Sequence, residues 1–206
     1  MYILDPIVIE KPWGVKPDLI KRSTGIRVAS QNPVGELWIA SGLRSLPNKT
    51  NWIKVDNKKK TIADIIENNP QFLGKNLTNV RKPVGKTEAW YVREIKGEVR
   101  TITGLKKGID KNEFQSLVRQ GFFKEKHTFE ELEKKIFTTR EFVKNGFYII
   151  PAGTIHAIYA PDKDSHIIID EIQQGFGDNA LPVLSKVLFV TNSTLSIQVH
   201  PSDADV

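Results

Sequence analysis

The stretch 195–201, Leu-Ser-Ile-Gln-Val-His-Pro, alternates apolar and polar residues near the end of the chain. Such alternation predicts a β-strand, in which side chains two residues apart point to the same face. Gln198 and His200 then share one face, and Ile197 and Val199 share the other. An amide oxygen and an imidazole side by side on a stiff strand can bind one metal ion. The stretch therefore predicts a strand that carries part of a metal site.

Strand-like segments of this kind occupy most of the chain, separated by turn residues. They cover residues 7–10, 35–40, 89–93, 99–103, 147–150, 155–159, 166–172, 183–190 and 195–200. Helices are expected over 61–68, 110–119 and 128–135, and the last two begin with the capping residues Asp110 and Thr128. The pattern predicts a mainly β fold, an antiparallel sandwich or barrel with a small helical insertion at about 108–138.

Two short segments are interpreted from their turn chemistry. Lys96-Gly97 lies between two predicted strands and indicates a hairpin that joins them. The lysines at 58–60 follow Asp56-Asn57 and are interpreted as a solvated turn, so they are given little weight as a nucleic-acid patch.

Composition limits the classes of protein that fit. The 206 residues suit one domain covering 1–206, and the absence of cysteine excludes disulfides, thiolate zinc sites and a catalytic thiol. The net charge of +6 favours anionic partners such as phosphorylated metabolites. The lysines are scattered, and no signal peptide or membrane-length apolar run is evident. We therefore expect a cytoplasmic protein with neither a nucleic-acid nor a membrane partner.

Glu88 and His156 are the other candidate metal ligands. His156 follows a Pro-Ala-Gly turn near the tip of a predicted strand, and Glu88 directly precedes the strand expected over 89–93. Together with Gln198 and His200 they form a set of two imidazoles, a carboxylate and an amide oxygen, which suits Zn²⁺ or a similar ion. The donors come from distant segments, so spacing alone also allows ordinary core or surface residues. His127 and His166 have no such partners in sequence and are interpreted as structural.

A set of long motifs resembles the type I mannose-6-phosphate isomerases, zinc enzymes of the cupin superfamily. The motifs are Lys-Pro-Trp-Gly at 11–14, Gly-Glu-Leu-Trp at 35–38, Gly-Lys-Thr-Glu-Ala-Trp-Tyr at 85–91, Ile-Pro-Ala-Gly-Thr-Ile-His-Ala at 150–157, Asp-Glu-Ile-Gln-Gln at 170–174 and the stretch at 195–201. Together they span nearly the whole chain. The resemblance implies a cupin-type jelly roll and interconversion of mannose 6-phosphate and fructose 6-phosphate through an enediol.

The resemblance also implies roles for individual residues. One zinc ion would be bound by Gln198, His200, Glu88 and His156. Lys86 and Glu171 would serve catalysis, with Lys86 as the candidate base; a solvated lysine or a phosphate contact is the alternative. The substrate would be bound by Trp13, Glu36 and Ser196, although Trp13 could equally be a core residue.

Two departures from the family pattern stand out. The Gln-x-His segment comes last here, whereas in the family it precedes the Lys-Thr-Glu strand, so residues 175–206 look transplanted. A genuine rearrangement, a segment exchanged between two copies, or a printed residue order that differs from the natural chain would each explain this. The family's Thr-Tyr-Arg stretch after Glu-Ile-Gln-Gln is also missing, because Gly175 follows Gln174.

Two functions follow from these observations. The first is a zinc-dependent isomerase of sugar phosphates, working as a monomer or a homodimer. The second is a cupin that binds metal and sugar phosphate without turnover, which the missing arginine favours.

Overall fold

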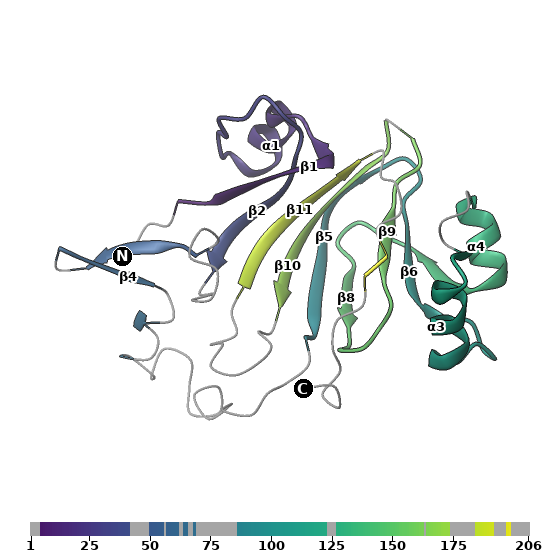
Figure 1. Ribbon diagram of the computed structural model, residues 1–206. Helices are drawn as coiled ribbons and strands as arrows, with labels where there is room; N and C mark the ends of the chain where they lie inside the picture. Colours follow the sequence, from purple (N-terminus) through teal and green to yellow (C-terminus); the bar gives the residue numbers. More distant parts are fainter. Residues whose placement is uncertain are drawn as a thin grey trace.

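The computed structural model describes residues 5–41, 50–55, 57–61, 64–65, 68, 86–122, 127–162, 164–173, 184–191 and 197–198. In these residues two antiparallel sheets face each other and short helices lie around them (Figure 1). The predicted fold class, a mainly β cupin-type sandwich with small helical content, is confirmed. No helix among the described residues is long and apolar enough to cross a membrane.

The larger sheet has six strands and is antiparallel throughout. In spatial order the strands are β1 (Ile7–Val15), β2 (Val34–Ser41), β11 (Leu184–Thr191), β10 (His166–Gln173), β5 (Glu88–Lys96) and β8 (Phe147–Ile150). Although β11 is late in the sequence, it lies in the middle of the sheet between β2 and β10, as Figure 1 shows.

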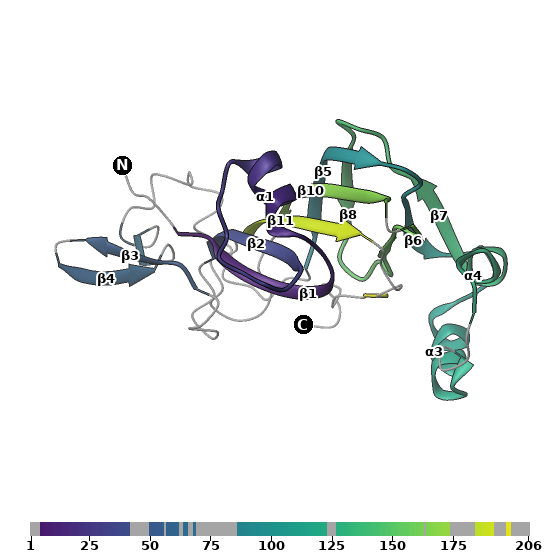
Figure 2. The same ribbon diagram turned by 90° about the horizontal axis from the view of Figure 1, so that it is seen from above.

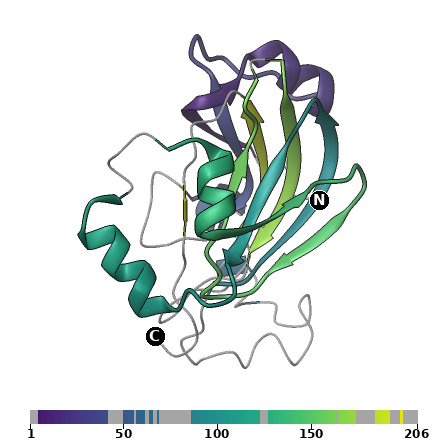
Figure 3. The same cartoon turned by 90° about the vertical axis from the view of Figure 1, so that its right-hand side faces the viewer.

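The smaller sheet has three strands, β7 (Phe137–Glu141), β6 (Arg100–Leu105) and β9 (Ala157–Tyr159) (Figure 2). Helices α3 (Lys111–Arg119) and α4 (Phe129–Lys135) lie beside it, away from the larger sheet (Figure 3). Both predicted caps are confirmed: Asp110 accepts from the amides of Asn112 and Glu113, and Thr128 forms a capping box with Glu131. Phe129 and Leu132 of α4 pack against Ile102 of β6, which fixes this helix to the sheet.

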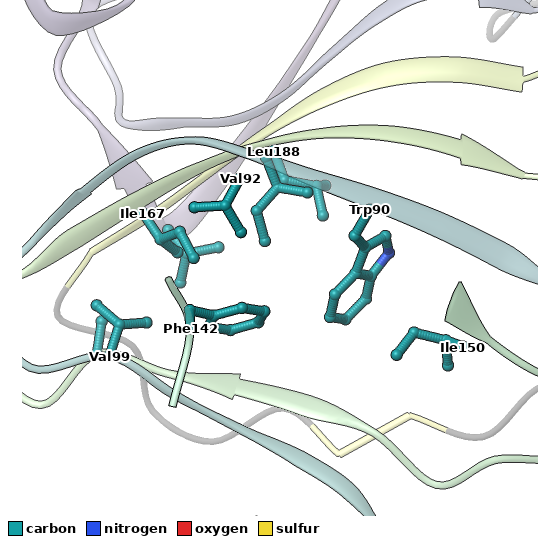
Figure 4. Packing of buried hydrophobic residues seen from close by; sticks show 10 residues of the cluster. Trp90, Val92, Val99, Phe142, Ile150, Ile167 and Leu188 are labelled. Carbon is teal, nitrogen blue, oxygen red and sulfur yellow. The ribbon is translucent and has the colours of Figure 1, made fainter. Parts of the chain in front are cut away.

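The space between the sheets is filled by an apolar cluster. Figure 4 shows Val92 and Trp90 of β5, Ile167 of β10 and Leu188 of β11 directed toward Val99 and Phe142. On the opposite face of the larger sheet, Leu37, Ile168 and Phe189 are fully buried beneath α1 (Pro17–Thr24) and its flanking loops. The sheet is therefore covered on both faces at its centre.

Several local predictions need correction. β5 and β6 do not pair with each other but belong to different sheets, so Lys96-Gly97 is a connection between sheets and not a hairpin. Gly97 has φ 72°, a left-handed conformation that glycine adopts without strain and that redirects the chain. Lys58, Lys59 and Lys60 are not a turn but belong to strand β4 (Lys58–Thr61), which pairs with β3 (Trp52–Val55) around Asn57.

Helix α1 and strands β3 and β7 were not predicted at all. The helix is short, although it has Pro17 at its start and Gly25 in a left-handed conformation at its end, the usual signals of both termini. The helix expected over 61–68 falls mostly outside the described residues, as does most of the strand expected over 195–200.

Candidate functional site

A pocket lies between the two sheets, next to the apolar cluster. The space not filled by atoms there amounts to about 530 Å³, and this figure includes space that is open to solvent. Seven separate segments supply its lining, which consists of Trp13, Glu36, Glu88, Trp90, His156, Ala157, Ile158, Glu171, Lys186, Leu188, Val190 and Gln198. Six of the nine residues predicted from the sequence to form the site thus meet in one pocket.

Gln198 reaches the pocket through a two-residue β-bridge with His156. The amide of His156 donates to the carbonyl of Gln198 at 2.9 Å, and the amide of Gln198 donates back to His156 at 2.8 Å. The bridge extends the small sheet at the end of β9 and explains how residues 42 positions apart in sequence become neighbours. Of the predicted strand at 195–200, this bridge is the part that lies within the described residues.

Glu88 and His156 face each other in this pocket, with Glu88 Oε2 3.6 Å from His156 Nε2. His156 Nδ1 lies 3.0 Å from the carbonyl oxygen of Thr154. Because a carbonyl only accepts, Nδ1 carries the proton in the neutral ring and Nε2 presents its lone pair to Glu88. Two electron-pair donors aimed at one space suit a cation between them.

The donor set therefore fits a divalent metal ion in its chemistry. A neutral imidazole and a carboxylate lie 3.6 Å apart at His156 and Glu88, and Gln198, whose amide oxygen could be a further ligand, lines the same pocket. Among the described residues alone, no group of three His, Cys, Asp or Glu side chains could hold a metal ion. The fourth predicted ligand, His200, lies outside the described residues, as does Ser196.

Other polar side chains hold Glu88 in place. Lys86 Nζ lies 2.5 Å from Glu88 Oε1, and the indole N–H of Trp90 donates to Glu88 Oε2 at 3.0 Å. All three residues are at most 6% exposed. Lys86 itself does not line the pocket but borders it through Glu88.

A second polar group lies across strands β2, β11 and β10. Lys186 Nζ lies 3.1 Å from Glu171 Oε1 and 3.9 Å from Glu36 Oε2, while Trp38 donates its indole N–H to Glu36 at 2.6 Å. Glu171 stands opposite Lys186 on one side and Trp90 on the other. Directly opposite residues share a sheet face, so this group and Glu88 belong to one surface.

Burial changes the ionisation of this pair. Desolvation raises the pKa of Glu171 to about 7, with Glu88 adding to the rise and Lys186 opposing it. Desolvation alone would lower the pKa of Lys186, but attraction by Glu171, Glu36 and Glu88 outweighs it and raises that pKa. Lys186 therefore stays charged, and Glu171 can gain or lose a proton near neutral pH.

Lys186 and Trp90 are the pocket residues with a charged or hydrogen-bonding side chain that were not predicted from the sequence. Lys186 had a signal, since it stands alone as a charged residue within the apolar strand 183–190. A charge at an inward position of a central strand needs a partner, and Glu171 is that partner here. Trp90 had no separate signal, because a tryptophan in a strand is more often a core residue.

Comparison with known proteins bears on the fold. Neither a protein-family model nor a curated protein matches this chain in sequence. A histidine-to-glutamine variant of phosphomannose isomerase from Salmonella typhimurium aligns with 95% of this chain and 72% of its own, at 12% identity and a TM-score of 0.50. This likeness shows that the chain has a fold like that of the mannose-6-phosphate isomerases.

Two further solved structures give lower scores. A candidate mannosephosphate isomerase from Archaeoglobus fulgidus aligns with 99% of this chain and 65% of its own, at 15% identity and a TM-score of 0.49. A mannose 6-phosphate isomerase bound with zinc and yttrium aligns with 96% and 70%, at 10% identity and a TM-score of 0.43. The chain thus spans 65% to 72% of the length of these three structures.

Proposed function

We propose that this protein is a zinc-dependent aldose–ketose isomerase that interconverts mannose 6-phosphate and fructose 6-phosphate. One observation carries the proposal: six residues that the family motifs single out, each from a different segment of the chain, line a single pocket. The isomerase-like fold supports the same reading. Chance placement would scatter these residues over both faces of the sheets.

Glu88, His156, Gln198 and His200 are the proposed ligands of the zinc ion. When bound, the ion supplies electrostatic stabilisation of the negative charge that develops on substrate oxygens. The hydrogen bond from His156 Nδ1 to Thr154 keeps Nε2 available for binding. Lys86 forms an ion pair with Oε1 of Glu88, and Trp90 donates a hydrogen bond to Oε2. The Glu88 carboxylate therefore has little freedom to rotate.

Glu171 and Lys86 are the proposed acid–base groups. The reaction moves a proton between C1 and C2 of the sugar through an enediol, so the site needs a group that takes up and returns a proton near pH 7. Glu171 has a pKa of about 7 and lines the pocket. Lys86 is bound to Glu88, so it would act only after that ion pair opens.

The substrate itself would lie over the second polar group. Trp13 and Glu36 line the pocket and offer an apolar ring and a hydrogen-bond acceptor to the sugar. Lys186 is the cation of the pocket lining, and we assign it to the phosphate of the substrate, for which it would have to exchange its ion pair with Glu171. We assign Ser196 to phosphate binding on the basis of the motif at 195–201.

A cupin that binds metal and sugar phosphate without turnover is the second candidate. The 2.5 Å contact between Lys86 and Glu88 favours it, because a base held by an ion pair is not free to accept a proton. The missing Thr-Tyr-Arg stretch after Gln174 favours it as well.

Metal analysis of the purified full chain tests the proposed site. We expect about one zinc or manganese ion per chain, and loss of metal in the variants His156→Ala and His200→Ala. His127→Ala is the matched control, since His127 stacks on Phe122 outside the pocket. Full metal retention in both ligand variants would refute the site.

A coupled assay for fructose 6-phosphate separates the two candidates. The isomerase predicts turnover of mannose 6-phosphate that requires metal and drops strongly in Glu171→Gln. Binding of sugar phosphate by calorimetry without any turnover, in the presence of zinc or manganese, would replace the first candidate with the second.

A further inference from the structure

Two strands of the larger sheet repeat the same short pattern, a glutamate followed two residues later by a tryptophan. In β2 the pair is Glu36 and Trp38, and in β5 it is Glu88 and Trp90. Side chains two residues apart share a strand face. In each pair the indole N–H donates to the carboxylate, at 2.6 Å for Trp38 to Glu36 and 3.0 Å for Trp90 to Glu88.

Trp90 contacts two of the proposed metal ligands at once. Besides its hydrogen bond to Glu88 Oε2, its ring meets the imidazole of His156 edge to face, with ring centroids 5.5 Å apart and an interplanar angle of 77°. Trp90 is 2% exposed and packs on Phe142 in the apolar cluster. The ring therefore has no room to swing away from either ligand.

The hydrogen bond from Trp90 to Glu88 has a preferred direction, whereas the packing of the Trp90 ring on its neighbours does not. Glu88 Oε2, the oxygen that accepts from Trp90, is also the one that lies 3.6 Å from His156 Nε2. The N–H that donates to this oxygen fixes the rotation of the carboxylate. One lone pair of Oε2 then remains for the side that faces the imidazole. Without the N–H, the Glu88 carboxylate loses its hydrogen bond at Oε2 and keeps the ion pair of Oε1 with Lys86.

We propose that Trp90 is a positioning residue for the metal site, acting through its indole N–H on Glu88 and through its ring on His156. This inference rests on the metal site of the proposed function. Groups that orient metal ligands typically change metal affinity by 10- to 100-fold when they are removed. Trp38 has the same bond to Glu36, which is not a proposed ligand, so it should not affect metal affinity.

The test is a metal titration of the full chain after removal of bound metal by a chelator. Wild type, Trp90→Phe, Trp38→Phe and Phe142→Leu are titrated with Co²⁺ and then with Zn²⁺, and the Co²⁺ absorption spectrum reports the ligand geometry. We expect Trp90→Phe to bind metal about 10-fold or more weakly, with an altered Co²⁺ spectrum. Trp38→Phe and Phe142→Leu should keep wild-type affinity; the second loosens the same core without removing the N–H.

The outcomes separate this inference from the proposed function. Unchanged affinity and spectrum in Trp90→Phe would overturn the role of Trp90 while leaving the metal site intact. Equal loss in Phe142→Leu would also overturn it, because core packing would then explain the effect. If wild type binds neither ion, both this inference and the zinc site fall. Should Trp90→Phe not fold, 3-benzothienylalanine at position 90, which has sulfur in place of the N–H, gives the same test.

Discussion

The face of the six-stranded sheet that lines the pocket has two ends that are both buried but differ in chemistry. Strands β5, β10 and β11 each run through both ends. One end carries charged side chains, namely Glu88, Glu171 and Lys186, and the other carries only aliphatic ones, namely Val92, Ile167, Ile169 and Val190. Positions only two to four residues apart on one strand thus differ between an apolar environment and a polar one.

This difference predicts opposite contributions of the two ends to the free energy of unfolding. Burying aliphatic side chains gains free energy, roughly 1.5–3 kcal/mol for each one. Burying an ion pair costs desolvation that the attraction seldom exceeds, and apolar replacements are often neutral or better. The ion pair of the polar end is therefore not expected to add to the stability of the fold, which agrees with the binding role given to this end under the proposed function.

The largest expected effect comes from breaking one charge at the polar end. Lys186→Met removes the cation that faces Glu171 and should lower the free energy of unfolding by about 4 kcal/mol at pH 8, measured by urea denaturation. Lys186→Met combined with Glu171→Leu should return to within about 1 kcal/mol of wild type or exceed it. A double variant as unstable as the single one would show that the pair itself stabilises the fold.

At the apolar end, removal of one side chain should behave differently. Ile169→Ala creates a cavity at a fully buried site and should cost about 3.5 kcal/mol in the same experiment. A second apolar truncation there should add to the loss and never restore stability. If Ile169→Ala cost less than 1 kcal/mol, this end would not be the packed core that we describe.

The sequence predicted the apolar end better than the polar one. Alternation and β-branched residues located β2, β8, β10 and β11 to within a residue or two, because these strands bury one face or both. The motifs located Glu88, His156 and Glu171. Lys186, the partner of Glu171, was not predicted. The two residues lie opposite each other only because of the register between β10 and β11, which the sequence does not show.

Connections were predicted less well than strands. Lys96-Gly97 gives the same sequence signal whether the two flanking strands pair with each other or belong to different sheets. Only the arrangement of the strands in the folded protein distinguishes these cases. The three lysines of β4 contradict the usual preference of strands for apolar residues, since they lie on an exposed hairpin. The local sequence shows neither the change of sheet after Lys96-Gly97 nor the exposed position of β4.

The pH dependence of the free energy of unfolding should distinguish the two ends without a substitution that creates a large cavity. The folded state raises the pKa of Glu171 from 4.5 to about 7, mainly by burial, so the folded protein binds this proton more tightly than the unfolded one. Stability from this group is full below pH 4.5 and is lost as pH rises through 7, by about 3 kcal/mol in total. Denaturation of the metal-free protein at several pH values measures the slope.

Glu171→Gln is the control for this slope, since the amide does not titrate. The pH profile of the variant should be flatter than that of wild type between pH 5 and 8, by about the amount assigned to Glu171. Identical profiles would place the titration elsewhere in the molecule. The aliphatic end provides no titrating group, so Ile169→Ala should keep the wild-type slope despite its lower stability.

The smallest effect is expected at Asp170, the neighbour of Glu171 on the opposite face of β10. Asp170 pairs with Arg93 at 2.6 Å, but the two side chains are 33% and 39% exposed. Water screens such a pair, so Asp170→Asn should cost less than about 1 kcal/mol, and the cost should shrink further in high salt. Two adjacent acidic residues on one strand would then differ several-fold in their effect on unfolding. Arg93 forms two hydrogen bonds to Asp170, whereas Lys186 makes one contact to Glu171, so a smaller effect at Asp170 would arise despite the better pair geometry and would point to burial.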